Sequence, residues 1–152
     1  MKKILSTFLF AAALSSATAQ TWSLDNSHSS IGFAVTHLNV AKTTGIFTDY
    51  ATTVSYTKED LSDLKVEMTI QTKSISTWNE QRDKHLAGAD FFDAEKYPTI
   101  TFKSTGVKKV KGNTYKITGD MTMHGVTKSV TFDMTYGGVN KDPYGNTKAG
   151  FS

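Results

Sequence analysis

Apolar and polar residues alternate with a period of two along most of the chain after residue 20. The clearest run spans 64–71, and further runs of the same kind occupy 31–37, 115–123 and 130–136. Because successive side chains of a β-strand point to opposite faces, this period predicts half-buried antiparallel strands. In the first of these strands, one face carries Ile31, Phe33, Val35 and His37.

Turn residues separate the alternating runs. Lys111-Gly112-Asn113 and His124-Gly125 are typical of tight hairpin turns. Asp142-Pro143-Tyr144-Gly145 fits a type I turn, so another strand should begin near Asn146 and end at Ser152. Such a short last strand leaves an open edge, and we therefore expect a domain truncated at its C-terminus, without its last strands. The pattern as a whole predicts an all-β fold, an antiparallel barrel or sandwich with one short helix.

One segment lacks the strand period. Thr77-Trp78-Asn79-Glu80 has the Thr-x-x-Glu form of a capping box, and Gly88 suits a helix end that needs a left-handed residue. These signals predict a short helix over 78–87. Its spacing places Trp78, Arg82 and His85 on one face, which is polar and aromatic. Such a face is expected at the edge of an opening.

The first residues form a separate segment. Lys2 and Lys3 precede an apolar stretch of about eleven residues, and Ala17-Thr18-Ala19 is a small-x-small site, which together predict a signal peptide over 1–19. Cleavage is expected after Ala19. The apolar stretch is shorter than the ~20 residues of a membrane-spanning helix, so a periplasmic or secreted single domain over 20–152 is expected, not a membrane-spanning protein.

Composition excludes several classes. The chain has no cysteine, so neither a disulfide framework nor a lipid-modified cysteine is expected. Removing Lys2 and Lys3 lowers the formal charge from +3 to +1, and no basic block follows them, so no nucleic-acid partner is expected.

Four histidines are candidates for chemistry, but their spacing connects no two of them as metal ligands, and no metal is expected. His28 and His124 lie in turns. His37 ends an apolar face, where it is either a structural residue or, if the barrel holds a cavity, one that faces a ligand. No hydrolase elbow or paired-carboxylate motif is present, and no catalytic residue is assigned.

Arg82 and Asp83 admit two interpretations. They either tether the helix to the sheet edge through charge-assisted hydrogen bonds, or Arg82 and His85 contact the polar end of a ligand at the opening. Phe91 and Phe92 are likewise either anchors of their loop or part of a pocket wall.

The chain resembles the YceI-like family of exported, lipid-binding bacterial proteins. The most specific block contains Arg82-Asp83-x-His85-Leu86, Phe91-Phe92-Asp93 and Tyr97-Pro98 in order. Two further blocks flank it, with Trp22, Asp25, His28, Phe33, His37 and Phe47 before it and Gly119, Met121 and His124-Gly125-Val126-Thr127 after it.

The resemblance implies a lipocalin-like barrel whose interior holds a polyisoprenoid, an isoprenoid quinone or a fatty-acyl amide, with no cofactor. The ligand-binding residues expected on this basis are Phe33, Val35, His37, Phe47, Trp78, Arg82, His85, Phe91 and Phe92. Family members usually continue for about two more strands, so an open edge that supports a homodimer is also expected.

Two other functions stay open. One is a hydrolase or isomerase that acts on a lipid-like substrate with Arg82 and His85 as acid and base. The other is a stress-response protein that binds a membrane redox protein.

Overall fold

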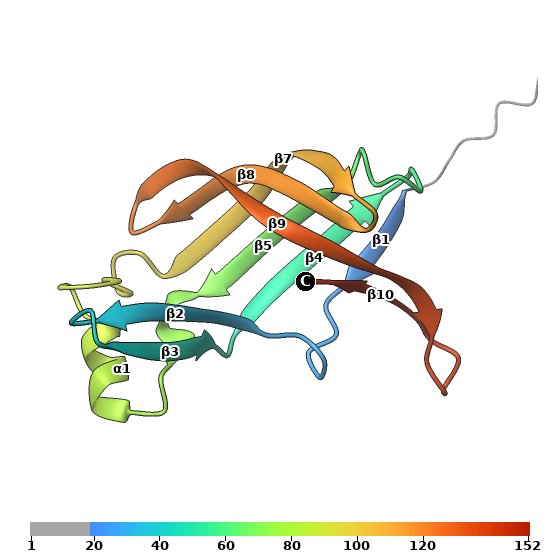
Figure 1. Cartoon of the computed structure of the whole chain (residues 1–152). Coiled ribbons are helices and arrows are strands. Elements are labelled where there is room, and N and C mark those ends of the chain that lie inside the picture. Colours follow the sequence, from blue (N-terminus) through green and yellow to red (C-terminus); the bar gives the residue numbers. More distant parts are fainter. Residues whose placement is uncertain (1–18) are drawn as a thin grey trace, which may run out of the picture.

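The computed structural model describes residues 19–152. The predicted signal peptide therefore lies outside the described residues, apart from Ala19. Two antiparallel sheets and one short helix make up the described part of the chain (Figure 1).

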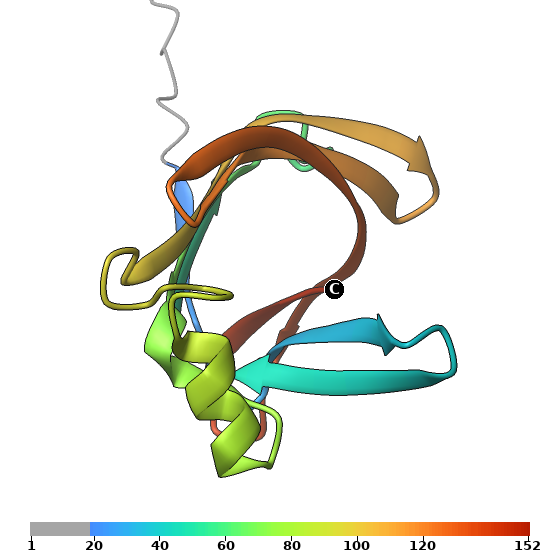
Figure 2. The same ribbon diagram turned by 90° about the vertical axis from the view of Figure 1, so that its left-hand side faces the viewer.

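Seven strands form the larger sheet, in the order β1-β4-β5-β7-β8-β9-β10. Their bounds are Gln20–Ser23, Tyr50–Tyr56, Lys65–Gln71, Thr99–Lys111, Thr114–Met123, Val126–Lys141 and Thr147–Phe151. Seen end on, this sheet curls into a nearly closed ring (Figure 2). The predicted all-β antiparallel barrel with one short helix is confirmed.

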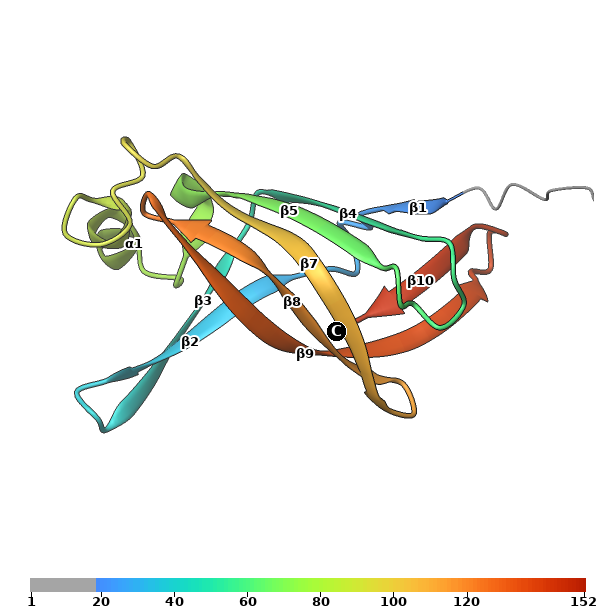
Figure 3. The ribbon, with the colours of Figure 1, turned by 90° about the horizontal axis from the view of Figure 1, so that it is seen from above.

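The smaller sheet covers part of the open side of the ring. It contains β2 (Ile31–His37), β3 (Ala41–Phe47) and β6 (Ile75–Ser76), and a 3-10 turn, η1 (Thr72–Ser74), leads into β6. The β2–β3 hairpin projects away from the larger sheet (Figure 3). β6 supports only its base, through the pairs Ile46–Ser76 and Phe47–Ile75 in the described residues.

The pairing register of the strands explains how the period-two pattern produces a ring with an apolar inner face. Val66 on β5 pairs with Val54 on β4, Met68 on β5 pairs with Phe102 on β7, and Ile117 on β8 pairs with Phe132 on β9. Apolar residues of neighbouring strands therefore lie side by side on the same face, which is the inner face of the ring. Burial of this face is the main stabilising contribution that the sequence pattern supplies.

The predicted turns are present. Gly112 has a φ of +55°, and His124 and Gly125 have φ values of +52° and +71°, the left-handed conformation that tight hairpins require. The amide of Gly145 donates to the carbonyl of Asp142 at 3.0 Å, and β10 begins two residues later, close to the expected position.

The helix differs from the prediction at both ends. α1 spans Glu80–Ala87, and its N-cap is Asn79, whose side chain accepts a hydrogen bond from the amide of Arg82 at 3.0 Å. Trp78 lies before the helix with a φ of +59°, so the predicted capping box and the shared face of Trp78, Arg82 and His85 are wrong. Gly88 ends the helix in an extended conformation with a φ of −73°, not the left-handed one that was expected.

Candidate functional site

Most side chains on the inner face of the ring are apolar, with Thr52 opposite Met68 and Lys128 opposite Met121 as polar exceptions. One buried cluster contains Tyr56, Leu61, Leu64, Phe102, Tyr115, Ile117 and Met134, and a second contains Phe47, Ile70, Ile75 and Ile100. Met68 packs against both clusters and joins them. Phe132 belongs to the same inner face but is 44% exposed, and Met123 at its end is 42% exposed. A continuous apolar surface that is accessible in part can receive an apolar chain.

Three aromatic rings close the side of this surface near α1. Phe47 lies 5.8 Å from Phe33 and 6.0 Å from Phe92, measured between ring centroids. Phe47 is buried, and the other two rings are half-buried. Gly45 makes this arrangement possible, because a Cβ at that position would lie 2.3 Å from the ring of Phe33. The structure thus brings together three of the nine residues expected to bind a ligand.

Val35 and His37, which share the predicted face of β2 with Phe33, do not join this aromatic group. Val35 is 53% exposed, and His37 at the end of the strand is exposed as well. The reason is the short β6, which supports the hairpin only as far as Ile46 and Phe47. The outer half of the hairpin therefore leaves the core.

Arg82 and Asp83 both bind Thr77, the buried residue that follows β6. Asp83 Oδ1 accepts from the backbone amide of Thr77 at 2.8 Å and from its hydroxyl group. Arg82 donates from Nε to Thr77 Oγ1 at 2.7 Å and from Nη2 to the Thr77 carbonyl at 2.8 Å. These bonds attach α1 to the edge of the smaller sheet, as the tether interpretation expects.

Replacing Asp83 with alanine should therefore destabilise the protein. The change leaves the amide and hydroxyl of Thr77, which is 3% exposed, without their acceptor. We expect the free energy of unfolding to fall by about 1–3 kcal/mol in urea denaturation. Glu80→Ala, on the exposed surface of the same helix, should change it by less than about 0.5 kcal/mol. Equal losses in the two variants would contradict the tether.

The other predicted site residues near α1 lie on its outer side. The ring of His85 packs edge-on against Phe91 at 4.9 Å, and His85 Nε2 lies 3.6 Å from an Asp90 carboxylate oxygen, beyond hydrogen-bond distance. Phe91 is 48% exposed and Trp78 is 71% exposed. The structure therefore separates Trp78 and His85 from the buried rings of Phe47 and Phe92.

His124 connects two parts of this end of the barrel. Its Nδ1 hydrogen-bonds to the Phe91 carbonyl oxygen at 2.7 Å, and its ring lies 4.6 Å from that of Tyr97. With Phe91, Phe92 and Met123 it lines an apolar hollow of about 210 Å³. Sequence reasoning placed His124 in a turn but missed this contact, because Phe91 is 33 positions away.

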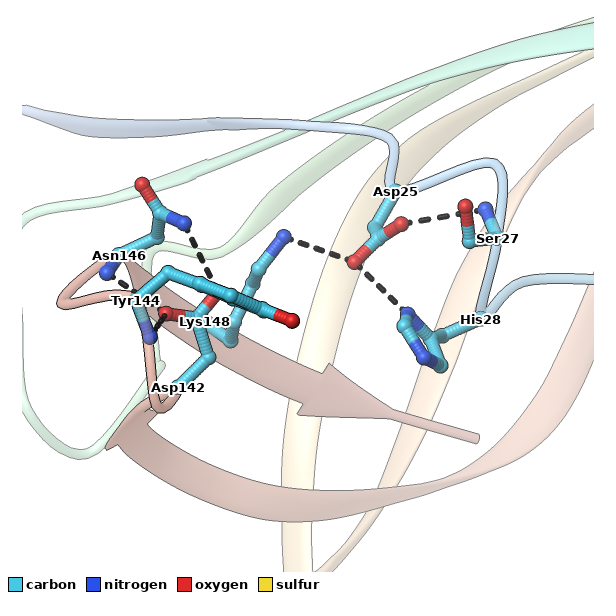
Figure 4. A network of polar contacts seen from close by, with 7 residues as sticks. All are labelled: Asp25, Ser27, His28, Asp142, Tyr144, Asn146 and Lys148. Atoms are coloured by element: carbon cyan, nitrogen blue, oxygen red, sulfur yellow. Dashed lines mark hydrogen bonds and ion pairs between the residues drawn. The ribbon is translucent and has the colours of Figure 1, made fainter.

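An ion pair joins the edge strand β10 to the loop that follows β1, the other edge strand of the large sheet. Lys148 Nζ on β10 lies 2.8 Å from Asp25 Oδ2, in the loop after β1, and His28 Nδ1 lies 3.1 Å from the same oxygen (Figure 4). The amide of Ser27 donates to the other carboxylate oxygen at 3.1 Å. The sequence placed His28 in a turn, but nothing in it connected Asp25 or His28 to Lys148.

This ion pair makes stability depend on pH. The hydrogen bond from Lys148, followed by that from His28, holds the pKa of Asp25 well below its usual range. A carboxylate with a lowered pKa stabilises the fold above the unfolded pKa of ~3.9, and this contribution is lost as the pH falls below it. Asp25→Asn should therefore show a smaller drop in Tm between pH 7 and pH 3 than the wild type.

The matched control is Asp120→Asn, a change to an exposed carboxylate on the outer face of β8. It should keep the wild-type drop in Tm over the same range. The role of Asp25 would be refuted if Asp25→Asn and the wild type lost the same number of degrees.

Residues 19–152 contain neither a metal cluster nor a membrane-spanning helix. No group of three or more His, Asp or Glu side chains is arranged to hold a metal ion. In the same residues, no helix has the length and apolar character needed to cross a membrane.

The fold is that of an antiparallel β-barrel with a largely apolar interior. Comparison with known proteins identifies the family. The model of the YceI-like domain matches residues 22–152. Protein YceI of Salmonella agona is 40% identical over 156 residues, which cover 99% of this chain and 81% of that protein. The chain belongs to the YceI-like family.

Solved structures agree with this assignment. The YceI protein of Campylobacter jejuni is 36% identical with a TM-score of 0.67, and the match covers 86% of this chain and 76% of that one. BcnA of Burkholderia cenocepacia is 29% identical with a TM-score of 0.69, and the match covers 74% of this chain and 70% of that one.

Proposed function

We propose that this protein binds one long-chain apolar ligand along the inner face of the barrel, as a periplasmic or secreted binding protein. A polyisoprenoid, an isoprenoid quinone and a fatty-acyl amide are the candidate ligands. The observation that carries the proposal is the continuous apolar inner face, which joins two buried clusters through Met68 and remains accessible at Phe132 and Met123.

The energetics favour a long chain. Each methylene group moved from water onto an apolar surface contributes about 0.8 kcal/mol. A tail that follows the inner face can therefore be held without a charged contact, and its affinity should rise with its length. Phe33, Phe47 and Phe92 supply the aromatic wall at the helix end of this path.

Catalysis by Arg82 and His85 has less support than binding. The guanidinium of Arg82 is engaged by Thr77 through two of its nitrogens. His85 packs on Phe91, and its neighbouring carboxylate belongs to the exposed Asp90. With Trp78, these side chains are better suited to contact a part of the ligand that leaves the barrel near α1.

The test is to purify the protein from cells that export it, extract it with organic solvent, and analyse the extract by mass spectrometry. A long-chain lipid in stoichiometric amount is expected, absent from an extract of an unrelated exported protein prepared in parallel. The stripped protein should bind a polyprenol or isoprenoid quinone again. Recovery of no lipid, together with no rebinding, would refute the proposal.

A further inference from the structure

Exposed apolar side chains gather at the end of the barrel that carries α1. The β2–β3 turn, α1 and the β8–β9 turn all lie at this end (Figure 1), around the mouth of the ring (Figure 2). Six large apolar side chains of these turns and of the loops that flank α1 are exposed: Leu38, Val40, Trp78, Phe91, Met123 and Val126. Apolar groups gathered on a surface commonly mark a contact with a protein or a membrane.

Leu38 and Val40 form the tip of the β2–β3 hairpin and are 77% and 84% exposed. The amide of Val40 closes the turn by donating to the carbonyl of His37 at 3.1 Å, and Leu38 and Asn39 have φ values of +51° and +59°. A left-handed backbone favours Gly, Asn or Asp over a bulky side chain. The turn therefore explains Asn39 but not Leu38, which the core does not bury either.

Trp78 shows the same combination in the loop before α1. It is 71% exposed and has a φ of +59°. Two large apolar side chains, in separate segments, thus keep positions that are unfavourable for the folded chain alone, and such backbone outliers point to a function. An indole suits the surface of a bilayer, because its apolar body carries one polar N–H group.

The charge of the hairpin is complementary to an anionic surface. Between Ile31 and Phe47, Lys42 is the only Lys or Arg, and no Asp or Glu occurs. Lys42 is exposed and follows Val40 by two positions. An ammonium group beside an apolar tip matches a membrane in which anionic headgroups lie next to acyl chains.

Charge also selects which side of this end makes the contact. The residues of α1 are neutral in sum, because two acidic and two basic side chains occur in Glu80–Ala87. The loop after α1 is acidic, with Asp90, Asp93 and Glu95 against Lys96. An anionic surface is therefore better matched to the hairpin and to the loop before α1 than to the loop after it.

We propose that the α1 end of the barrel docks on an anionic phospholipid bilayer. Leu38 and Val40 lie among the acyl chains, Trp78 lies at the level of the headgroups, and Lys42 contacts the anionic headgroups. This inference goes beyond the proposed function, because docking needs no ligand in the barrel. Where both hold, the mouth of the ring faces the compartment from which a long-chain lipid is taken.

Sedimentation with phospholipid vesicles tests the inference. The wild type should partition onto vesicles of phosphatidylcholine and phosphatidylglycerol. The hairpin variant, Leu38→Asn with Val40→Thr, should bind them at least about tenfold more weakly, because it removes both apolar contacts with the acyl chains. Asn suits a left-handed backbone and Thr keeps the β-branch, so this variant should remain folded in circular dichroism.

Two further variants control for position and charge. Val110→Thr changes a residue that is 56% exposed beside the β7–β8 turn, at the opposite end of the barrel (Figure 1), and should bind vesicles as the wild type does. Lys42→Gln should weaken binding about fivefold when phosphatidylglycerol is present. It should not change binding to phosphatidylcholine alone.

A fluorescence measurement on the wild type avoids substitution of the hairpin. The emission of Trp78 should shift to shorter wavelength with vesicles and should be quenched by brominated acyl chains. Trp78→Asn retains Trp22 as its only tryptophan and should show neither change.

The results separate this inference from the proposed function. Absence of vesicle binding, equal losses in the hairpin variant and Val110→Thr, no effect of Lys42→Gln, or an unshifted Trp78 emission would overturn the inference. Dimerisation of the free protein that the hairpin variant abolishes would assign the tip to a protein contact and would also overturn it. Failure to take up a polyprenol, with vesicle binding retained, would refute the proposed function alone.

Discussion

Replacing Gly119 with alanine is expected to lower the free energy of unfolding by about 2–3 kcal/mol, near the upper end of the usual range for overpacked sites. A Cβ at this position of β8 would lie 2.5 Å from the carbonyl oxygen of Lys103 and 2.5 Å from the ring of Phe102. Phe102 is 4% exposed and belongs to a buried cluster, so neither the ring nor the neighbouring backbone has room to move.

Gly106→Ala is the matched control, because a Cβ at this glycine on β7 has no atom within 4 Å. Both glycines lie in the β7–β8 pair, so any general effect of alanine on this ladder is shared. In urea denaturation, the free energy of unfolding should fall more for Gly119→Ala than for Gly106→Ala. The expected difference is more than about 1.5 kcal/mol, roughly half of the overpacking penalty. Similar values would show that the contact between β7 and β8 has room for a Cβ at Gly119.

Phe132→Asp is expected to reduce the affinity for a long-chain lipid by at least about tenfold. Phe132 faces the interior, packs edge-on against Phe102 at 5.5 Å and is 44% exposed. A carboxylate there would lose water when the apolar chain binds, and nothing apolar can replace its hydration. Binding can be measured by titration of the stripped protein with a polyprenol or an isoprenoid quinone.

Thr135→Asp adds the same charge to the outer face of the same strand, where Thr135 is exposed. It should bind lipid as the wild type does. If both variants bound equally well, the ligand would not follow the inner face of β9, and the proposed path along the barrel would be wrong.

The sequence predicted the sheet well because its signal is local and periodic. One buried face requires an apolar side chain at every second position, as Met68 and Ile70 show, and the turns at Gly112 and Gly125 require a left-handed backbone. Both signals can be read without knowledge of distant residues.

Helix boundaries and site contacts were harder to predict. Trp78 has a left-handed φ and Asn79 is the N-cap, so the helix starts at Glu80, although Thr77 and Glu80 matched the capping pattern. The capping pattern does not reveal this conformation, because Thr77 bonds to Arg82 and Asp83, five and six positions later, in place of the expected cap.

Long-range pairing was the main omission. Asp25 and Lys148 are 123 positions apart, and a charge on each of two loops or strands predicts no contact between them. The outward position of Val35 and His37 has a similar cause, since it depends on where β6 ends and not on the pattern of β2 itself. The family blocks located the residues near α1 but did not reveal which of them face the interior.

The short β6 also leaves the two sheets unequally supported. β2 and β3 pair along seven positions, yet β6 secures only the last two residues of β3, whereas β8 pairs with both β7 and β9 along its length. Local opening requires little free energy where few contacts must be broken. We therefore expect the outer half of the hairpin to open at a lower free energy than any ladder of the large sheet.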